Sequence, residues 1–303
     1  MLDAELSFAD ILIGKNNMTK NKHKKNLVIA SPFFYNSIRT FKKNANNIYE
    51  VIIINTDIEN LIETLKKIKM RGWIDMTRAG YGENGLFLES LLNIKHNDLP
   101  IPDYNDIELK VQSKYSEYPI TLFSLDLNGP EPMELQRLVA RYGAYDSMYP
   151  NSKILYIRLN HKEYTKWGKS LKMKLHYNKY EKKLYIHVSH KNGKTIEIKS
   201  FWHINSILST MQRKLSNLCV VECQTKTNNF SKYIYYSNFK LYKLLSHDNF
   251  IKALLNGKIF VHIKYGIYKS GPKAGLPYNH GISFQVYFKD LNNIFEEVLL
   301  QKK

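Results

Sequence analysis

The chain has 303 residues, of which 45 are Lys or Arg and 27 are Asp or Glu, so its formal net charge is +18. Hydrophobic residues make up 44% of the sequence, an ordinary share for a globular protein with a substantial core. No apolar run approaches the length of a membrane span, and the charges at the start do not follow the order of a signal peptide. The basic excess favours a polyanionic partner, although an AT-rich, Lys-coding genome would produce the same bias.

The first 70 residues precede every motif described below. They contain a basic run over 19–25, short apolar segments over 27–33 and 50–55 that predict strands, and a predicted helix over 57–70. The helix follows from apolar residues at helical spacing, from Ile58 to Ile68. We expect residues 1–70 to form an added element packed on the core, and no role is assigned to it.

A short helix is expected next, after the glycines Gly80, Gly82 and Gly85. Glu89 lies within its apolar run, Leu86 to Leu92, where a carboxylate is costly unless it has a partner. A metal site, or the lysine beside one, would be such a partner. The alternative is a glutamate at the edge of the helix that faces water.

The segment IPDYNDIELKVQ carries the pattern with the clearest chemistry. Asp103 lies in a turn before a predicted strand over 107–113, and Glu108 and Lys110 share one face of that strand because side chains alternate. Converging carboxylates offer hard oxygen ligands to Mg²⁺, and a lysine beside the ion orients a water and offsets phosphate charge. This spacing is typical of a metal-dependent nuclease, whereas the alternative is a solvated charged strand face.

A second strand over 118–126 is expected to form an antiparallel hairpin with the first. Gln112 shares the face of Lys110 and is a candidate contact to a water or phosphate, with a surface polar residue as the favoured alternative. A helix then begins after Pro132 and ends near Gly143. It places Arg137 and Arg141 one turn apart, as a phosphate clamp or as part of a solvated face.

The rest of the chain reads as strands over 154–160, 172–177, 183–190 and 195–200, helices over 203–215 and 246–256, and a hairpin at Asn192-Gly193. Lys and Tyr alternate in the third of these strands and just before it, as in a ribbon that lies in a DNA groove or in a half-exposed hairpin. Cys219 and Cys223 lack a second pair of zinc ligands, so packed, reduced thiols are expected.

Near the C-terminus, Asn279-His280-Gly281 forms a predicted loop that leads into a strand over 282–288. A loop His and Asn flanked by Gly can reach base edges or phosphates. The alternative is an ordinary turn with a surface His.

Three segments, TRAGYGENGLFLESLL, PDYNDIELKVQSKYSEYPITLFS and NHGISFQV, occur in an order that resembles the MvaI/BcnI type of type II restriction endonuclease. That family is related in its catalytic lobe to the MutH mismatch-repair nickase. The resemblance runs from about Arg71 to Ser124 and is faint from there to the C-terminal segment. It implies an α/β (α+β mixed) PD-(D/E)XK core, with a central mixed sheet flanked by helices, and a β-rich recognition lobe across a DNA cleft.

The resemblance also implies site roles. Asp103, Glu108 and the main-chain carbonyl of Leu109 would hold Mg²⁺, with Mn²⁺ as a substitute, while Lys110 is the active-site lysine and Glu89 the helix carboxylate. The candidate DNA contacts are Arg78, Gln112, Lys273, Asn279 and His280. Asn279 stands where the family has Asp, and Gln285 where a basic residue is expected, so the target sequence stays open.

The function implied is a type II restriction endonuclease that cuts double-stranded DNA as a monomer in the cytoplasm of a bacterium or archaeon, without a membrane partner. A cognate DNA methyltransferase would be its genetic partner. The alternatives are a MutH-like nicking repair enzyme and a non-enzymatic basic DNA-binding protein. We expect the catalytic core over 71–150 and the recognition region over 151–303, part of which, about 203–245, returns to the catalytic lobe.

Overall fold

The computed structural model describes residues 37–43, 49–76, 84–95, 101–228 and 230–298. The chain divides into two units, Met1–Thr56 and Asp57–Lys303. In the first unit, strands β1 (Ser37–Lys43) and β2 (Tyr49–Asn55) pair antiparallel. The expected strand over 27–33 lies outside the described residues. Helix α2 (Thr56–Met70) has the predicted extent. Its apolar side chains pack in a cluster with residues of the second unit.

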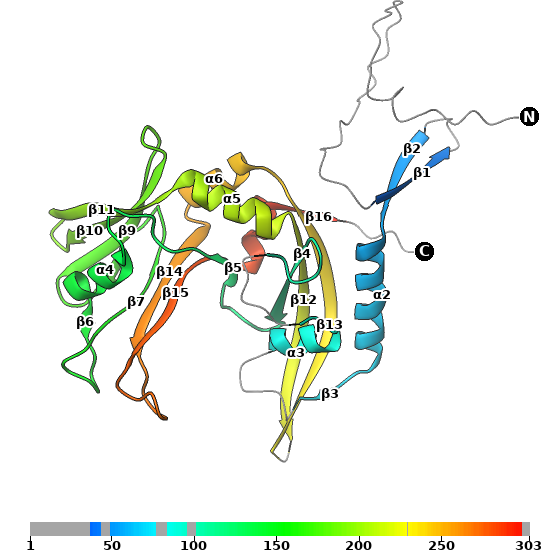
Figure 1. Cartoon of the computed structure of the whole chain (residues 1–303), viewed down its shortest axis with the longest axis horizontal. Coiled ribbons are helices and arrows are strands. Elements are labelled where there is room, and N and C mark those ends of the chain that lie inside the picture. The colour runs from blue at the N-terminus through cyan, green and yellow to red at the C-terminus, as the bar shows by residue number, and fades with distance from the viewer. Residues whose placement is uncertain (1–36, 44–48, 77–83, 96–100, 229, 299–303) are drawn as a thin grey trace, which may run out of the picture. The chain divides into compact units, whose positions relative to one another are not determined.

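The first sheet of the second unit carries the predicted nuclease motif. Its strand order is β16-β13-β12-β4, and a short strand, β3, pairs with β13 (Figure 1). The strands are β3 (Ile74–Asp75), β4 (Ile107–Ser113), β12 (Asn217–Asn228), β13 (Ser231–Leu244) and β16 (Phe295–Val298). β4 runs parallel to β12, whereas the other pairs are antiparallel, so the sheet is mixed as expected.

Two helices cover one face of the first sheet. Leu61, Leu65 and Ile68 of α2 and Leu88 of α3 (Asn84–Leu91) pack with Leu109 of β4 and with both cysteines of β12 in one apolar cluster. Cys219 and Cys223 are free and buried, as predicted. Because Leu109 faces this cluster, the alternating side chains Glu108 and Lys110 face the other side of the sheet.

The predicted hairpin between 107–113 and 118–126 is wrong. β5 (Ile120–Ser124) pairs with β15 in a second sheet, whose order is β5-β15-β14-β7-β6, while β4 takes β12 as its partner. The other strands of the second sheet are β6 (Ala144–Tyr145), β7 (Lys153–Leu159), β14 (Ile259–Ile267) and β15 (Pro277–Val286). The chain between β4 and β5 therefore crosses from one sheet to the other, and a parallel partner from far along the chain completes the motif's sheet.

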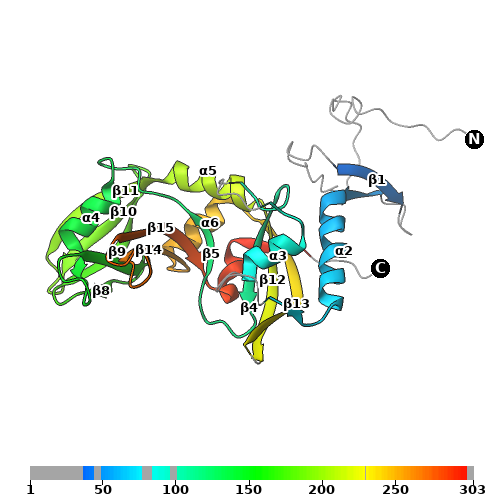
Figure 2. The ribbon, with the colours of Figure 1, turned by 60° about the horizontal axis from the view of Figure 1, so that its bottom comes forward.

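A third sheet, β11-β10-β9-β8, packs into the same core as the second (Figure 2). It comprises β8 (Thr165–Trp167), β9 (Leu171–Asn178), β10 (Lys183–His190) and β11 (Thr195–His203), with Asn192-Gly193 in the predicted hairpin turn. The remaining helices are α4 (Glu134–Tyr142), α5 (Ile204–Leu215), α6 (His247–Leu255) and the 3-10 helix η1 (Phe288–Asn293). None of the helices in the described parts of the chain is long and apolar enough to cross a membrane.

Arg137 of α4 is neither a phosphate clamp nor part of a solvated face. Its guanidinium donates to Glu134 at 2.6 Å, to Ser200 at 2.9 Å and to both oxygens of Glu197 on β11. Only Arg141 is exposed, with 57% of its side chain accessible, and it lies 3.2 Å from Glu197. The two carboxylates, 3% and 9% exposed, need this cation because a buried unpaired charge is costly.

Candidate active site

The turn before β4 brings Asp103 back over the strand. Tyr104 and Ile107 exchange two backbone hydrogen bonds of 3.0 and 2.8 Å, and Asn105 between them adopts a left-handed conformation with φ 51°. Asn tolerates that conformation better than most residues. Asp103 Oδ2 then accepts the backbone N–H of Leu109 at 2.9 Å. The carboxylate is thereby fixed beside the residue that follows Glu108.

Glu108 is the buried centre of the site. It is 0% exposed, Lys110 Nζ donates to its Oε1, and its Oε2 is buried without a hydrogen-bond partner. Burial raises the pKa of Glu108 and the charge of Asp103 adds to the rise, whereas Lys110 and Lys214 oppose it. The structure therefore brings Asp103, Glu108 and Lys110 together as the motif predicted, and leaves one carboxylate oxygen for a further cationic partner.

Lys214 is the residue that the sequence analysis missed. It lies in the last turn of α5, and its Nζ is 3.4 Å from Glu108 Oε1. The chain continues from α5 directly into β12, where Leu218 is the register partner of Glu108. The C-terminal end of α5 therefore lies beside the first residues of β4, which carry the motif. No local pattern marks Lys214, because its position depends on pairing between distant strands.

The donor set fits a hard divalent cation. Two carboxylates and a main-chain carbonyl are oxygen ligands, and Mg²⁺ commonly takes one or two carboxylates and keeps several waters. Within the described residues there is no group of three or more His, Cys, Asp or Glu that could hold a metal. Glu89, half-buried on α3, is therefore not gathered with Asp103 and Glu108 into a three-acid cluster, and its catalytic role stays a prediction.

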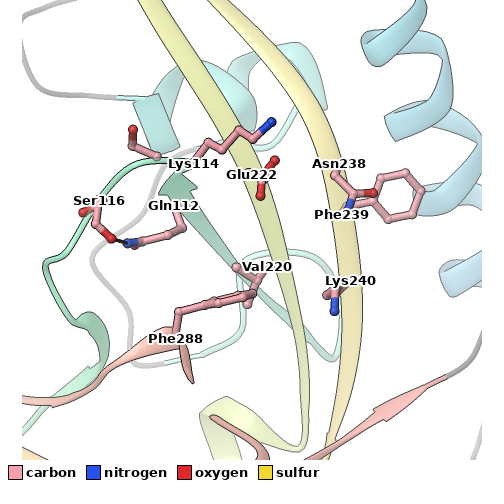
Figure 3. A pocket seen from close by; sticks show the side chains of 10 residues that line it. Gln112, Lys114, Ser116, Val220, Glu222, Asn238, Phe239, Lys240 and Phe288 are labelled. Carbon is pink, nitrogen blue, oxygen red and sulfur yellow. Dashed lines mark hydrogen bonds between the residues drawn. The ribbon is translucent and has the colours of Figure 1, made fainter. Parts of the chain in front are cut away.

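Gln112 supports the turn that follows β4. Its Nε2 donates to the carbonyl oxygens of Tyr118 at 3.2 Å and Ser116 at 3.5 Å. Figure 3 shows Gln112 directed at Ser116, beside a cavity of about 110 Å³ that also contacts Glu222 and Lys240. These bonds favour a structural role for Gln112, and its contact with DNA stays a prediction.

Asn279 and His280 lie within β15 and not in a loop. Asn279 Oδ1 accepts the N–H of Gly281 at 2.8 Å, and Gly281 has φ +68°, which a residue with a side chain rarely adopts. The ring of His280, an exposed residue, stands edge-on to Tyr278 at 3.7 Å between centroids. The strand also stops at Val286, short of the predicted end at 288.

Lys273 and Arg78 are the other two residues predicted to contact DNA. Lys273 lies in the exposed turn between β14 and β15, with its Nζ 5.7 Å from the ring centre of Tyr268. Arg78 lies outside the described residues.

Comparison with known proteins agrees with this arrangement. A structure described as the MvaI restriction endonuclease in complex with cognate DNA matches at 25% identity and TM-score 0.74, over 81% of this chain and 98% of that one. MvaI without DNA matches at 24% identity and TM-score 0.52, over 82% and 98% of the two chains. The comparison with curated protein sequences gave no match.

The model of the MvaI/BcnI restriction endonuclease family matches residues 62–295. The match includes the motif of β4, the second and third sheets and the return to β12 and β13. It confirms the resemblance found in the sequence, and the mixed α+β fold agrees with it. Because the match extends over most of its length, the chain belongs to the MvaI/BcnI restriction endonuclease family and is a type II restriction endonuclease.

Proposed function

We propose that this enzyme hydrolyses phosphodiester bonds at a short specific sequence in double-stranded DNA, in a Mg²⁺-dependent reaction centred on Asp103, Glu108 and Lys110. The observation that carries the proposal is the unpartnered, buried Oε2 of Glu108 beside two ammonium groups. A buried carboxylate oxygen without a hydrogen-bond partner is costly, and a bound cation would satisfy it. The net charge of +18 supports a polyanionic substrate.

Asp103, Glu108 and the carbonyl of Leu109 would hold the ion, with Mn²⁺ as a substitute for Mg²⁺. When bound, the ion would act as a Lewis acid on the phosphate and lower the pKa of a water. Lys110, which hydrogen-bonds Glu108, would hold the attacking water in line and offset charge on the phosphate. Attack at phosphorus forms a bond to the water oxygen, whose proton passes to solvent, and breaks the bond to the 3′ oxygen, which takes a proton from solvent. The products are a 3′-hydroxyl and a 5′-phosphate.

We infer the partner and setting from the family match. The MvaI structure that this chain resembles contains cognate DNA, and we extend that partner to this chain. Asn279, His280 and Lys273 are the proposed DNA contacts from the recognition region, Arg78 is a proposed contact from the catalytic core, and Glu89 is a proposed accessory carboxylate. We place the enzyme, as a monomer, in the cytoplasm of a bacterium or archaeon. A DNA methyltransferase protects the host sequence as its genetic partner.

The test is plasmid cleavage by the purified protein. Wild type should cut with Mg²⁺ and stop when the metal is chelated, while Lys110→Ala should bind DNA and fail to cut. Lys114→Ala is the matched control, because Lys114 is an exposed lysine just beyond β4 and makes no contact with Glu108 that the structure describes. Cleavage by Lys110→Ala at the wild-type rate would refute the mechanism. A requirement for an added protein would favour a MutH-like nickase.

A further inference from the structure

One face of the third sheet carries lysines and histidines but no acidic residue. Alternation sends Met173 and Leu175 of β9 and Ile186 and Val188 of β10 into the core. The strand register gathers the other alternate residues of β8, β9 and β10 on the opposite face, here named the outer face. They are Lys166, Lys172, Lys174, His176, Asn178, Lys183, Tyr185, His187 and Ser189. The Lys- and Tyr-rich strand β10, expected as a groove-binding ribbon or a half-exposed hairpin, is thus part of a wider basic face.

Two lysines of the outer face stand directly opposite each other. Lys166 of β8 is the register partner of Lys172 on β9, and Lys174 is the register partner of His187 on β10. Neighbouring strands are only about 5 Å apart, and like charges placed opposite each other destabilise a sheet. The described lysines of this sheet that form ion pairs are Lys183 and Lys199. The other positive charges of the face are therefore not neutralised by a carboxylate there.

Tyr164, just before β8, holds two of these ammonium groups in place. The Nζ atoms of Lys172 and Lys174 lie 4.7 and 4.8 Å from the centre of its ring. The Tyr164 hydroxyl is 3.1 Å from His187 Nδ1, and His187 Nε2 is 3.0 Å from Thr195 Oγ1. A cation over an aromatic ring is attracted to it without being neutralised. The two ammonium groups are thus fixed close together, and their charge stays available to an anion from outside.

His187 senses the positive field of this face. Burial lowers its pKa, and the charges of Lys174, His176 and Lys172 lower it further. A carboxylate in the same place would raise the pKa instead. The potential at the outer face is therefore positive, which attracts a polyanion.

The core separates the outer face from the side of the second sheet that faces the catalytic strand. Ile157 and Val261 of the second sheet pack in the same apolar cluster as the inner residues of the third. Arg158, next to Ile157 on β7, points to the other side. It lines a hollow of about 630 Å³ together with Ser113, at the end of β4, and the segment 115–118. A duplex that occupies this hollow leaves the outer face exposed.

We propose that the outer face binds the phosphate backbone of a second DNA duplex, without reading its sequence, while the target duplex lies at the catalytic strand. This inference rests on the proposed function, because the first duplex is the substrate of that reaction. Lysine contacts phosphate as a point charge, whatever the bases are.

DNA is the polyanion that fits this face. A duplex carries one negative charge per about 1.7 Å of its axis, so several lysines can meet phosphates at once. The substrate is itself a long polyanion, and a distant segment of the same molecule is present at a high effective concentration. A second contact would keep the enzyme on that molecule while it searches for its target.

The test is the capture of a second duplex by the Lys110→Ala protein, which should bind its target without cutting it. A one-to-one complex with a short target duplex is formed first, with the target taken from the sequenced ends of cut plasmids. A fluorescent duplex without the target is then titrated in at several salt concentrations. Adding Lys166→Gln, Lys172→Gln and Lys174→Gln should weaken its capture by about 10-fold or more. The slope of log affinity against log salt should fall by about 2–3, since each phosphate contact contributes about 0.9.

The matched control removes three exposed lysines from the helices α2 and α6. Lys66→Gln, Lys69→Gln and Lys252→Gln change the net charge equally and should leave capture unchanged. Thermal unfolding checks that both triple variants are folded. The outer-face variant should melt at or above the wild-type temperature, because it loses a pair of like charges that face each other.

Four outcomes would overturn the proposal: no capture of a second duplex, equal loss in the control variant, equally tight binding of polyglutamate, or a matching loss of affinity for the target duplex. The last would place these lysines in the path of the first duplex. Failure of the unmutated enzyme to cut any sequence would refute the proposed function instead. Binding of the fluorescent duplex alone, compared between the two triple variants, would then still decide whether the outer face holds DNA.

Discussion

Replacing Arg137 by alanine should cost much of the protein's stability and little of its intrinsic affinity for DNA. The guanidinium is the common partner of Glu134 and Glu197, and Tyr142 also donates to Glu197 at 3.0 Å. Burial raises the pKa of Glu197, but the hydrogen bonds from Arg137 and Tyr142 outweigh it, so the pKa lies below its usual value. Glu197 is thus a buried carboxylate that depends on this arginine.

The magnitude follows from the burial of the partners. Removing one member of a buried ion pair typically costs about 3–5 kcal/mol, because the other charge stays buried and unpaired. A whole domain is stable by only about 5–15 kcal/mol, so Arg137→Ala should be close to unfolding. Arg141→Ala is the matched control: its side chain is 57% exposed and makes a single pair with Glu197. An exposed pair contributes about 0–1 kcal/mol.

Urea denaturation monitored by circular dichroism would measure both losses. Changing Arg137 to Met together with Glu134→Gln and Glu197→Gln should recover part of the stability, since no unpaired charge then stays buried. A loss below about 1 kcal/mol for Arg137→Ala would refute the reasoning about the buried pair. If both arginine variants kept full stability and lowered the salt dependence of DNA binding equally, the phosphate clamp would be right after all.

Three further predictions concern single groups. Lys214→Met should slow single-turnover cleavage by about 10- to 1,000-fold, with Lys214→Arg less affected; wild-type rates would remove Lys214 from the site around Glu108. For His262, burial lowers the pKa from 6.5 to about 4 on folding. As the pH falls, His262 is therefore protonated in the unfolded chain at a higher pH than in the folded protein, which favours unfolding. The free energy of unfolding should drop by about 2 kcal/mol between pH 7 and 5, and this drop should be absent from His262→Asn. Burial raises the pKa of Cys219 to about 12 and of Cys223 to about 11, so a thiol reagent at pH 8 should label both only after unfolding; rapid labelling of native protein would contradict their burial.

Local patterns in the sequence predicted the elements well. Apolar spacing gave the helix over 57–70, alternation gave the strand over 107–113, and Asn192-Gly193 gave a hairpin turn, all of which the structure contains. The same alternation placed Glu108 and Lys110 on one face, and the turn chemistry before them brought Asp103 near. These successes share a cause, since each depends on residues within a few positions of one another.

Long-range pairing was not predictable in this way. The strand over 107–113 was given the next strand as its partner, whereas it pairs with Asn217–Asn228. Lys214 was missed for the same reason, and Arg137 was misjudged because its acidic partner Glu197 is on another element. The sequence pattern around a basic residue on a helix is the same whether that residue faces water or a buried carboxylate. Only the packing of distant segments decides between them.

The parallel pairing of β4 with β12 has a consequence for the cell that makes this protein. Asp103, Glu108 and Lys110 leave the ribosome early, but the strand beside them and Lys214 come from beyond residue 213. A stalled or prematurely terminated chain would therefore lack β12 and Lys214, and the proposed active site would be incomplete. The chain also passes back and forth between the first and second sheets, so neither sheet is a terminal module that could be exchanged. A new target preference would therefore have to arise by substitution of residues within the existing sheets.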